Sequence, residues 1–197
     1  MRLFTGLDLS LEVARALGHV LDRLRPAARL KWSPPENLHI TTRFIGEWPA
    51  ERLPELRAAL GEIPSHPAIP IHIRNLGFFP NPRSPRVFWA GVEAGPDLAA
   101  LASETDRALE ALGLKPEGRP FRPHLTLARI KHPAPLQKLR ESIAALPSLD
   151  FGGFRADRFF LYHSRLNPAG SVYTKLAEFP LGSCGILGQG EIVPQGE

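Results

Sequence analysis

The stretch Leu-His-Ile-Thr-Thr-Arg, LHITTR at residues 38–43, decides how this chain is read. Side chains of a β-strand alternate between its two faces, so His39 and Thr41 share one face while the leucine and isoleucine beside them share the other. A face of leucine and isoleucine is typical of a sheet core. The sequence therefore predicts a strand at 38–45 that turns a histidine and a threonine away from its core.

The same arrangement recurs 85 residues later, in HLTLAR at residues 124–129, where His124 and Thr126 flank a leucine. In a chain of 197 residues with seven histidines, chance gives roughly 0.2 copies of histidine-x-threonine. Two copies with apolar flanks therefore indicate one shared site, although a lone histidine on a strand is more often a packing residue. The other five histidines have no threonine two residues on, and we expect them to lie on the surface or in packing contacts.

Similar elements in a similar order surround the two motifs. Apolar spacing and turn residues predict, in chain order, a strand at 2–9, a helix at 11–24, a strand at 38–45, a helix at 50–60, two strands within 69–93, a helix at 97–112, a strand at 124–130, a helix at 136–146, and strands at 154–164 and 171–179. The first helix is expected to be capped by Ser10 or Asp8 and ended by Pro26.

The repeated order predicts a single bilobal α+β domain at residues 1–182, with two related, interleaved lobes that face each other, and a Gly-rich tail at 183–197. The alternative is that α and β elements in alternation resemble each other in most α+β proteins, whether or not their halves are related.

Composition narrows the class of protein. With 43% apolar residues the chain can bury a substantial core, and no apolar run approaches the roughly 18 residues that cross a bilayer. The first residues lack a secretory signal, so we expect a cytoplasmic protein. Cys184 is the only cysteine, which excludes an internal disulfide and a thiolate-rich metal site.

The charge of the chain is positive and carried mainly by arginine. The net charge is +4, and 19 of the 24 basic residues are arginine, whose planar guanidinium suits phosphate. A polyanionic ligand is one explanation, and a genome whose base composition favours arginine, alanine and proline is the other.

Two histidines that face each other fit displacement at phosphorus. A neutral imidazole takes a proton from the attacking oxygen, and a protonated imidazole gives one to the departing oxygen. Two histidines are too few ligands for a catalytic zinc site, and neither motif has an Asp, Glu or Cys two to four residues on. The sequence also lacks GxSxG, a P-loop and a dinucleotide fingerprint, so we expect no metal and no cofactor.

These motifs resemble the two-histidine phosphoesterases and, within them, the LigT-like RNA 2′,3′-cyclic phosphodiesterases, also called 2′-5′ RNA ligases. The likeness runs through RLFTGLDL, NLHITTRFIGE, FRPHLTLARI and LYHSRLNPAGSVYTKLAEF, nearly the whole chain. It implies a bilobal α+β fold with two pseudo-symmetric lobes, each with an antiparallel sheet and flanking helices around a central cleft. It also implies metal-independent hydrolysis of RNA 2′,3′-cyclic ends to 2′-phosphomonoesters.

The resemblance gives roles to particular residues. It makes His39 the proton donor to the leaving 3′ oxygen and His124 the base that activates water. Thr41 and Thr126 would bind the cyclic phosphate, and Arg129 matches the basic phosphate contact of the family.

Arg43 stands where the family often has lysine, after Thr42 where leucine is usual. Strand alternation puts Arg43 on the face of the histidines, as a further candidate for phosphate binding, but puts Arg129 on the opposite face unless a bulge or the strand end re-aims it. Both arginines also have a simpler explanation as solvated strand residues. Phe121, Trp32 and Tyr173 are candidates for stacking on a base, although core packing explains each of them as well.

Two other functions stay open at this point. One is the ligation of RNA halves through a 2′-5′ bond, with a 5′-hydroxyl in place of water. The other is an RNA-binding module whose histidines only hydrogen-bond phosphate, which explains the charge but not the choice of two titratable residues. The expected partners are RNA ends with a 2′,3′-cyclic phosphate, tRNA fragments among them, and we expect a monomer that does not associate with membranes.

Overall fold

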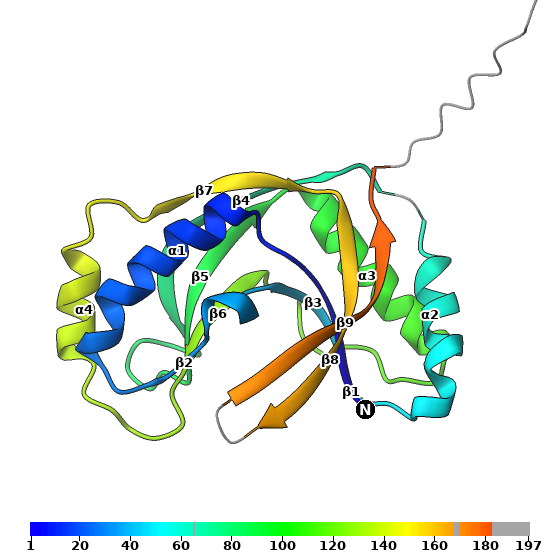
Figure 1. Ribbon diagram of the computed structural model, residues 1–197, viewed down its shortest axis with the longest axis horizontal. Helices are drawn as coiled ribbons and strands as arrows, with labels where there is room; N and C mark the ends of the chain where they lie inside the picture. The colour runs from blue at the N-terminus through cyan, green and yellow to red at the C-terminus, as the bar shows by residue number, and fades with distance from the viewer. Residues whose placement is uncertain (65, 168–169, 183–197) are drawn as a thin grey trace, which may run out of the picture.

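Antiparallel strands form one curled sheet in the computed structural model, which describes residues 1–64, 66–167 and 170–182 (Figure 1). The strands are β1 (Arg2–Leu7), β2 (Lys31–Trp32), β3 (Ile40–Glu47), β4 (Ile69–Phe79), β5 (Val87–Ala94), β6 (His124–Arg129), β7 (Asp150–Ala156), β8 (Arg158–Asn167) and β9 (Gly170–Pro180). The helices are α1 (Leu11–Leu24), α2 (Leu53–Gly61), α3 (Pro96–Ala111) and α4 (Gln137–Ala144), with 3-10 turns at Arg25–Ala27, Pro35–Asn37 and Ala50–Arg52.

The sheet consists of two halves of four strands, in the order β7-β4-β5-β6 (the first half-sheet) and β3-β1-β8-β9 (the second half-sheet). The short β2 pairs with β6. A single residue pair, Ile40 with Leu125, joins the halves through β3 and β6. β3, which begins directly after His39, and β6, which begins at His124, therefore lie side by side at the centre of the molecule, and the other strands follow outward in matching positions.

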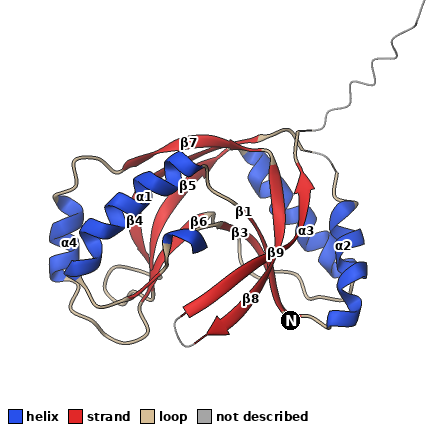
Figure 2. Cartoon of the chain, viewed as in Figure 1, coloured by secondary structure: helices blue, strands red, loops and turns tan. Residues whose placement is uncertain are grey.

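Helices cover each half-sheet, and the chain crosses between the halves to place them. α1 and α4 pack at the first half-sheet, while α2 and α3 pack at the second (Figures 1 and 2). α1 follows β1 of the second half-sheet, and α3 follows β5 of the first, so each of these helices leaves its strand for the other half. The two lobes are therefore interleaved along the sequence.

One buried apolar cluster continues through both halves. It includes Leu3 and Ile40 from the second half-sheet and Ile73 and Leu125 from the first, each at most 1% exposed. A smaller buried cluster of Phe4, Phe160 and Tyr162 lies apart from it. This second cluster backs the functional site described below.

The helices agree well with their predicted positions. α1 spans the predicted residues, and the Ser10 hydroxyl caps it by accepting a hydrogen bond from the Val13 N–H at 3.3 Å. The predicted helix at 50–60 opens with a 3-10 turn and becomes α-helical at Leu53. No helix in the described parts of the chain is long and apolar enough to span a membrane.

Three expectations for the strands need correction. The strand predicted at 38–45 is β3 at Ile40–Glu47, so His39 lies directly before it. The run at 154–164 is two strands, because β7 ends at Ala156 to pair with β4, while β8 begins at Arg158 and pairs with β1. The two expected sheets are one sheet joined at its centre, and the two-residue β2 was not predicted. The predicted tail at 183–197, with Cys184, lies outside the described residues.

Candidate active site

The pair of Ile40 and Leu125 fixes the geometry of the two motifs. β3 and β6 run antiparallel and share this one pair, which puts His39 on the side of Thr126 and Thr41 on the side of His124. His39, Thr41, His124 and Thr126 form a four-residue cluster in which the two histidines occupy one diagonal. In a regular ladder, two residues on such a diagonal are roughly 7 to 8 Å apart. Both imidazoles therefore approach one small volume at the centre of the sheet.

Burial confirms which face carries the cluster. Ile40 and Leu125 are fully buried at 0% exposure, whereas the four cluster residues are half-buried. The apolar positions of both motifs lie in the core, so the polar positions line the opposite, concave face of the sheet.

The backbone holds the two imidazoles in the same way. Nδ1 of His39 lies 2.7 Å from the carbonyl of Asn37, and Nδ1 of His124 lies 2.8 Å from the carbonyl of Arg122. A carbonyl only accepts hydrogen bonds, so in each ring Nδ1 carries the hydrogen. Nε2 is then the atom of each neutral ring that takes up a proton, and of each protonated ring that gives one away.

Aromatic rings enclose His39. Its imidazole stacks on Phe4 with 4.6 Å between centroids and contacts the edge of Tyr173 at 5.1 Å. Burial is the largest effect on the pKa of His39, and it lowers this pKa. The carbonyl of Asn37 and the charge of Asp8 raise the pKa, whereas the charges of Arg129 and His124 lower it. The net shift is downward. Arg129 and His124 are thus close enough to act electrostatically on the ring.

His124 also has an aromatic neighbour, in the first half-sheet. The edge of its ring contacts Phe79 at 5.2 Å, and Phe79 stacks on Trp89 at 5.0 Å. Aromatic packing thus backs both rings and limits their freedom to rotate.

A β-bulge after each motif decides where the two predicted arginines point. In β6 the pairing with β5 skips Leu127, so Leu127 and Ala128 are both buried and Arg129 returns to the exposed face of the histidines. The bulge therefore places Arg129 on the face of the histidines, as its role in phosphate binding requires. It is the bulge, invisible in the sequence pattern, that brings this cation to the site.

The equivalent bulge in β3 turns Arg43 away. The pairing with β1 skips Thr42, whose hydroxyl bonds that of the buried Thr5 at 2.8 Å. Arg43 then faces α3, where its guanidinium lies 2.6 Å from Asp106, and it also lies 3.0 Å from Glu117 in the segment after α3. The expectation from strand alternation that Arg43 shares the face of the histidines is wrong, because the bulge reverses the alternation.

A cluster behind His39 was not predicted as part of the site. Asp8 accepts hydrogen bonds from Tyr162 and from Lys175. Burial, followed by the hydrogen bond to Asp8, raises the pKa of Tyr162, so this phenol stays neutral. The alternation of Phe4, Gly6 and Asp8 along the first strand was the signal available in the sequence, because it puts all three on one face.

Two cavities border Tyr173, which contacts His39. One, of about 500 Å³, is lined by His39, Asp8 and Tyr173 among others. The second, of about 780 Å³, includes Trp32, Arg129 and again Tyr173. Two of the predicted aromatic candidates therefore border space at the site, while Phe121 packs against the main core.

Metal ligands are not grouped in this region. Among the residues that the structure describes, no three His, Cys, Asp or Glu side chains gather as a metal site would require.

Comparison with known proteins places the chain in a family. The model of the 2′-5′ RNA ligase superfamily matches residues 12–168. The chain belongs to this superfamily. Superfamily relatives of similar length include the RNA 2′,3′-cyclic phosphodiesterase of Methanothermobacter thermautotrophicus, 34% identical over 183 residues that cover 92% of this chain and 99% of the relative. The enzyme of that name from Thermus thermophilus is 38% identical over 189 residues, covering 92% of this chain and 90% of its own.

Solved structures of the superfamily share the fold. A crystal structure of a Thermus thermophilus protein has a TM-score of 0.76 at 35% identity and covers 92% of this chain and 98% of its own. E. coli LigT complexed with 3′-AMP has a TM-score of 0.71 at 28% identity, with 91% and 97% of the two chains covered.

Proposed function

We propose that this protein hydrolyses RNA 2′,3′-cyclic phosphodiester ends to 2′-phosphomonoesters by paired-histidine acid and base catalysis. The observation that carries the proposal is the pair of imidazoles on one diagonal, each held to the backbone through Nδ1 with Nε2 left for chemistry. Relatives at about one-third identity over nearly the whole chain carry the name of this activity.

Each side chain of the site has one role in the proposed reaction. Nε2 of His124 takes a proton from water, whose oxygen forms a bond to phosphorus. The bond from phosphorus to the 3′ oxygen breaks, and Nε2 of His39 donates a proton to that oxygen. The hydroxyls of Thr41 and Thr126 and the guanidinium of Arg129 stabilise the charge on the non-bridging oxygens.

The lowered pKa of His39 bears on its role as the acid. In the free protein this shift favours the neutral ring, which by itself suits a base. A bound phosphodiester carries a negative charge next to the ring and favours the protonated form, which opposes the shift. Substrate binding therefore favours the protonated ring of His39 that the acid requires, and we assign His39 as the proton donor and His124 as the base.

The superfamily description favours a second reaction of the same site. Ligation through a 2′-5′ bond is the same displacement with a 5′-hydroxyl in place of water: its oxygen bonds to phosphorus while the bond to the 3′ oxygen of the cyclic end breaks. We extend the proposal to a cytoplasmic monomer whose substrates include tRNA fragments. An RNA-binding module without turnover is the alternative that the following experiment addresses.

The test is incubation of the protein, with EDTA present, with an oligoribonucleotide that ends in a 2′,3′-cyclic phosphate, followed by mass and isomer analysis. We expect a 2′-phosphate product whose formation falls by at least about 10²-fold in His39→Ala and in His124→Ala. His19→Ala is the matched control, because this histidine is exposed on α1. Tight binding of the RNA without any turnover by the unaltered protein would establish the binding module instead.

A further inference from the structure

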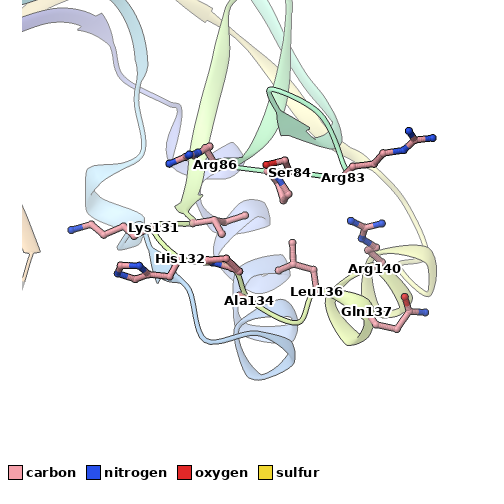
Figure 3. Close-up of a pocket in the computed structure, with 12 residues that line it drawn as sticks. Arg83, Ser84, Arg86, Lys131, His132, Ala134, Leu136, Gln137 and Arg140 are labelled. Atoms are coloured by element: carbon pink, nitrogen blue, oxygen red, sulfur yellow. The ribbon is translucent and has the colours of Figure 1, made fainter.

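A basic cavity lies outside the histidine cluster. Its volume is about 380 Å³, and it is formed by the connection between β4 and β5, the segment after β6 and the first turn of α4 (Figure 3). Its polar lining consists mainly of Arg83, Arg86, Lys131, His132, Gln137 and Arg140.

The charge of this cavity is unbalanced. No carboxylate lines it, and among the described residues none of its three arginines or its lysine makes an ion pair. Glu141, the acidic residue of α4, instead accepts a hydrogen bond from Gln137 at 2.8 Å. Several unpaired cations around one hollow raise the local concentration of anions.

Hydrogen bonds hold the rim of the cavity in place. The side chain of Asn81 accepts hydrogen bonds from the N–H groups of Arg83 and Ser84 at 2.9 and 3.0 Å. Arg140 donates to the carbonyl of Pro82 and also lies over the ring of Phe78 at 5.9 Å. The loop and the helix are thus tied together, which reduces the ordering cost when an anion binds.

The end of β6 connects this cavity to the histidine cluster. Arg129 is the last residue of β6, the next residue, Ile130, bonds the carbonyl of Arg86 at 2.8 Å, and Lys131 follows. Lys131 comes five positions after Thr126, so the two lie no more than about 18 Å apart. A few nucleotides of single-stranded RNA span that distance.

The cationic side chains of the cavity lie on two sides of it. In Figure 3 Arg86 and Lys131 extend to one side of the cavity, and Arg83 and Arg140 lie on the other. His132 is the one aromatic residue of the lining, which otherwise offers guanidinium and ammonium groups that suit phosphate.

We propose that this basic cavity binds a backbone phosphate of the RNA strand a few nucleotides upstream of the cyclic end. The inference rests on the proposed function and specifies its substrate class as oligoribonucleotides rather than cyclic mononucleotides. The histidine cluster selects the chemistry of the end, and the cavity recognises the chain that leads to it.

The test compares two substrates with the same cyclic end, a 2′,3′-cyclic mononucleotide and an oligoribonucleotide several nucleotides long. In the double variant Arg86→Gln/Lys131→Gln we expect kcat/KM for the oligonucleotide to fall about tenfold. The slope of log kcat/KM against log salt concentration should flatten by about 0.7 for each phosphate that the variant no longer binds. The mononucleotide does not reach the cavity, so its kcat/KM should not change.

Arg107→Gln is the matched control, because it removes an exposed arginine from α3 at the other half-sheet. We expect it to change neither substrate. Thermal melting checks the fold of the double variant, and the single variants replace it if its melting temperature falls.

Equal losses on both substrates, or no loss and no change of salt slope on the oligonucleotide, would overturn the inference while leaving the proposed function intact. If the unaltered protein hydrolyses neither substrate, the proposed function fails. Fluorescence anisotropy with a labelled oligoribonucleotide ending in a 2′-phosphate then tests the cavity alone, since weaker binding by the double variant supports it and equal binding contradicts it.

Discussion

His39 combines two opposite influences on one imidazole. Enclosure by Phe4 and Tyr173 disfavours its charge, while the nearby carboxylate of Asp8 favours it. Because burial is the larger effect, the ring in the free protein is mainly neutral at neutral pH. The site is therefore sensitive to any anion that enters it.

We predict that NMR titration will give His39 a pKa below about 6.5 in the free protein and a higher value with a 2′-phosphate product bound. Because the folded-state pKa is the lower one, the neutral ring stabilises the fold above about pH 6.5, and this contribution is lost as the pH falls through the folded-state pKa. His39→Gln should reduce the fall in unfolding free energy over that range. A pKa above 6.5 in the free protein would contradict this account.

Arg129 and Arg43 should respond differently to the same substitution. Arg129 is exposed on the face of the histidines, so Arg129→Gln should lower kcat/KM by about 10- to 100-fold through weaker phosphate binding and leave the melting temperature unchanged. Steady-state kinetics and thermal melting measure both quantities. An unchanged kcat/KM would remove Arg129 from the site.

Arg43→Gln is expected to show the reverse behaviour. Its side chain is only 10% exposed and pairs with the largely buried Asp106, so the variant leaves a carboxylate without its partner. We expect the unfolding free energy to fall by about 1 to 3 kcal/mol and kcat/KM to change little. Chemical denaturation checks the first, and a large kinetic effect with normal stability would return Arg43 to the site.

At the scale of elements, the close approach of β1 to β3 depends on one glycine. A Cβ atom on Gly6 would lie 2.6 Å from the carbonyl oxygen of Ile40, a backbone atom that cannot give way without moving β3. Gly6 also pairs directly with Thr41, so any shift of β3 reaches the histidine motif.

We predict that Gly6→Ala lowers the unfolding free energy by about 1 to 3 kcal/mol and also lowers kcat/KM, because the strain displaces a catalytic strand. Gly18→Ala is the control, since a Cβ there meets no atom within 4 Å and alanine favours the helix. Denaturation and kinetics of both variants are the measurements. Normal kinetics in Gly6→Ala would show that the strand accommodates the extra carbon.

Helices and strands could be predicted from the sequence where their apolar pattern is strong. The details of the site could not be predicted where a bulge interrupts that pattern. The stripe of α1 and the two His-x-Thr strands follow from regular alternation. The extra residues at Thr42 and Leu127 leave no mark in that pattern, yet they decide which arginine joins the site. The break at Asp157 was also hidden, because the residues on both sides of it have the composition of strands.

At the scale of the whole molecule, the two half-sheets share one core and exchange helices. α1 and α3 each pack at the half that does not contain the preceding strand, so neither half holds its own elements contiguously in the sequence. The repeat in the sequence predicted two lobes, but pattern alone does not reveal which helix covers which sheet.

We therefore expect both halves to unfold in one cooperative transition. Trp89 lies on β5 of the first half-sheet and Trp48 just after β3 of the second, so variants that retain only one of them report on each half. Their fluorescence midpoints in urea should coincide. Two separate midpoints would show that the lobes fold independently.

The identical anchoring of both imidazoles through Nδ1 has a consequence for the proton inventory of a catalytic cycle. Hydrolysis leaves the former donor neutral and the former acceptor charged, which is the starting condition of the opposite, bond-forming reaction. Exchange with the buffer must reset both rings before the next phosphodiester is cleaved, and equally before a 5′-hydroxyl attacks a cyclic end, because that hydroxyl takes the place of water and needs the same neutral base and charged acid.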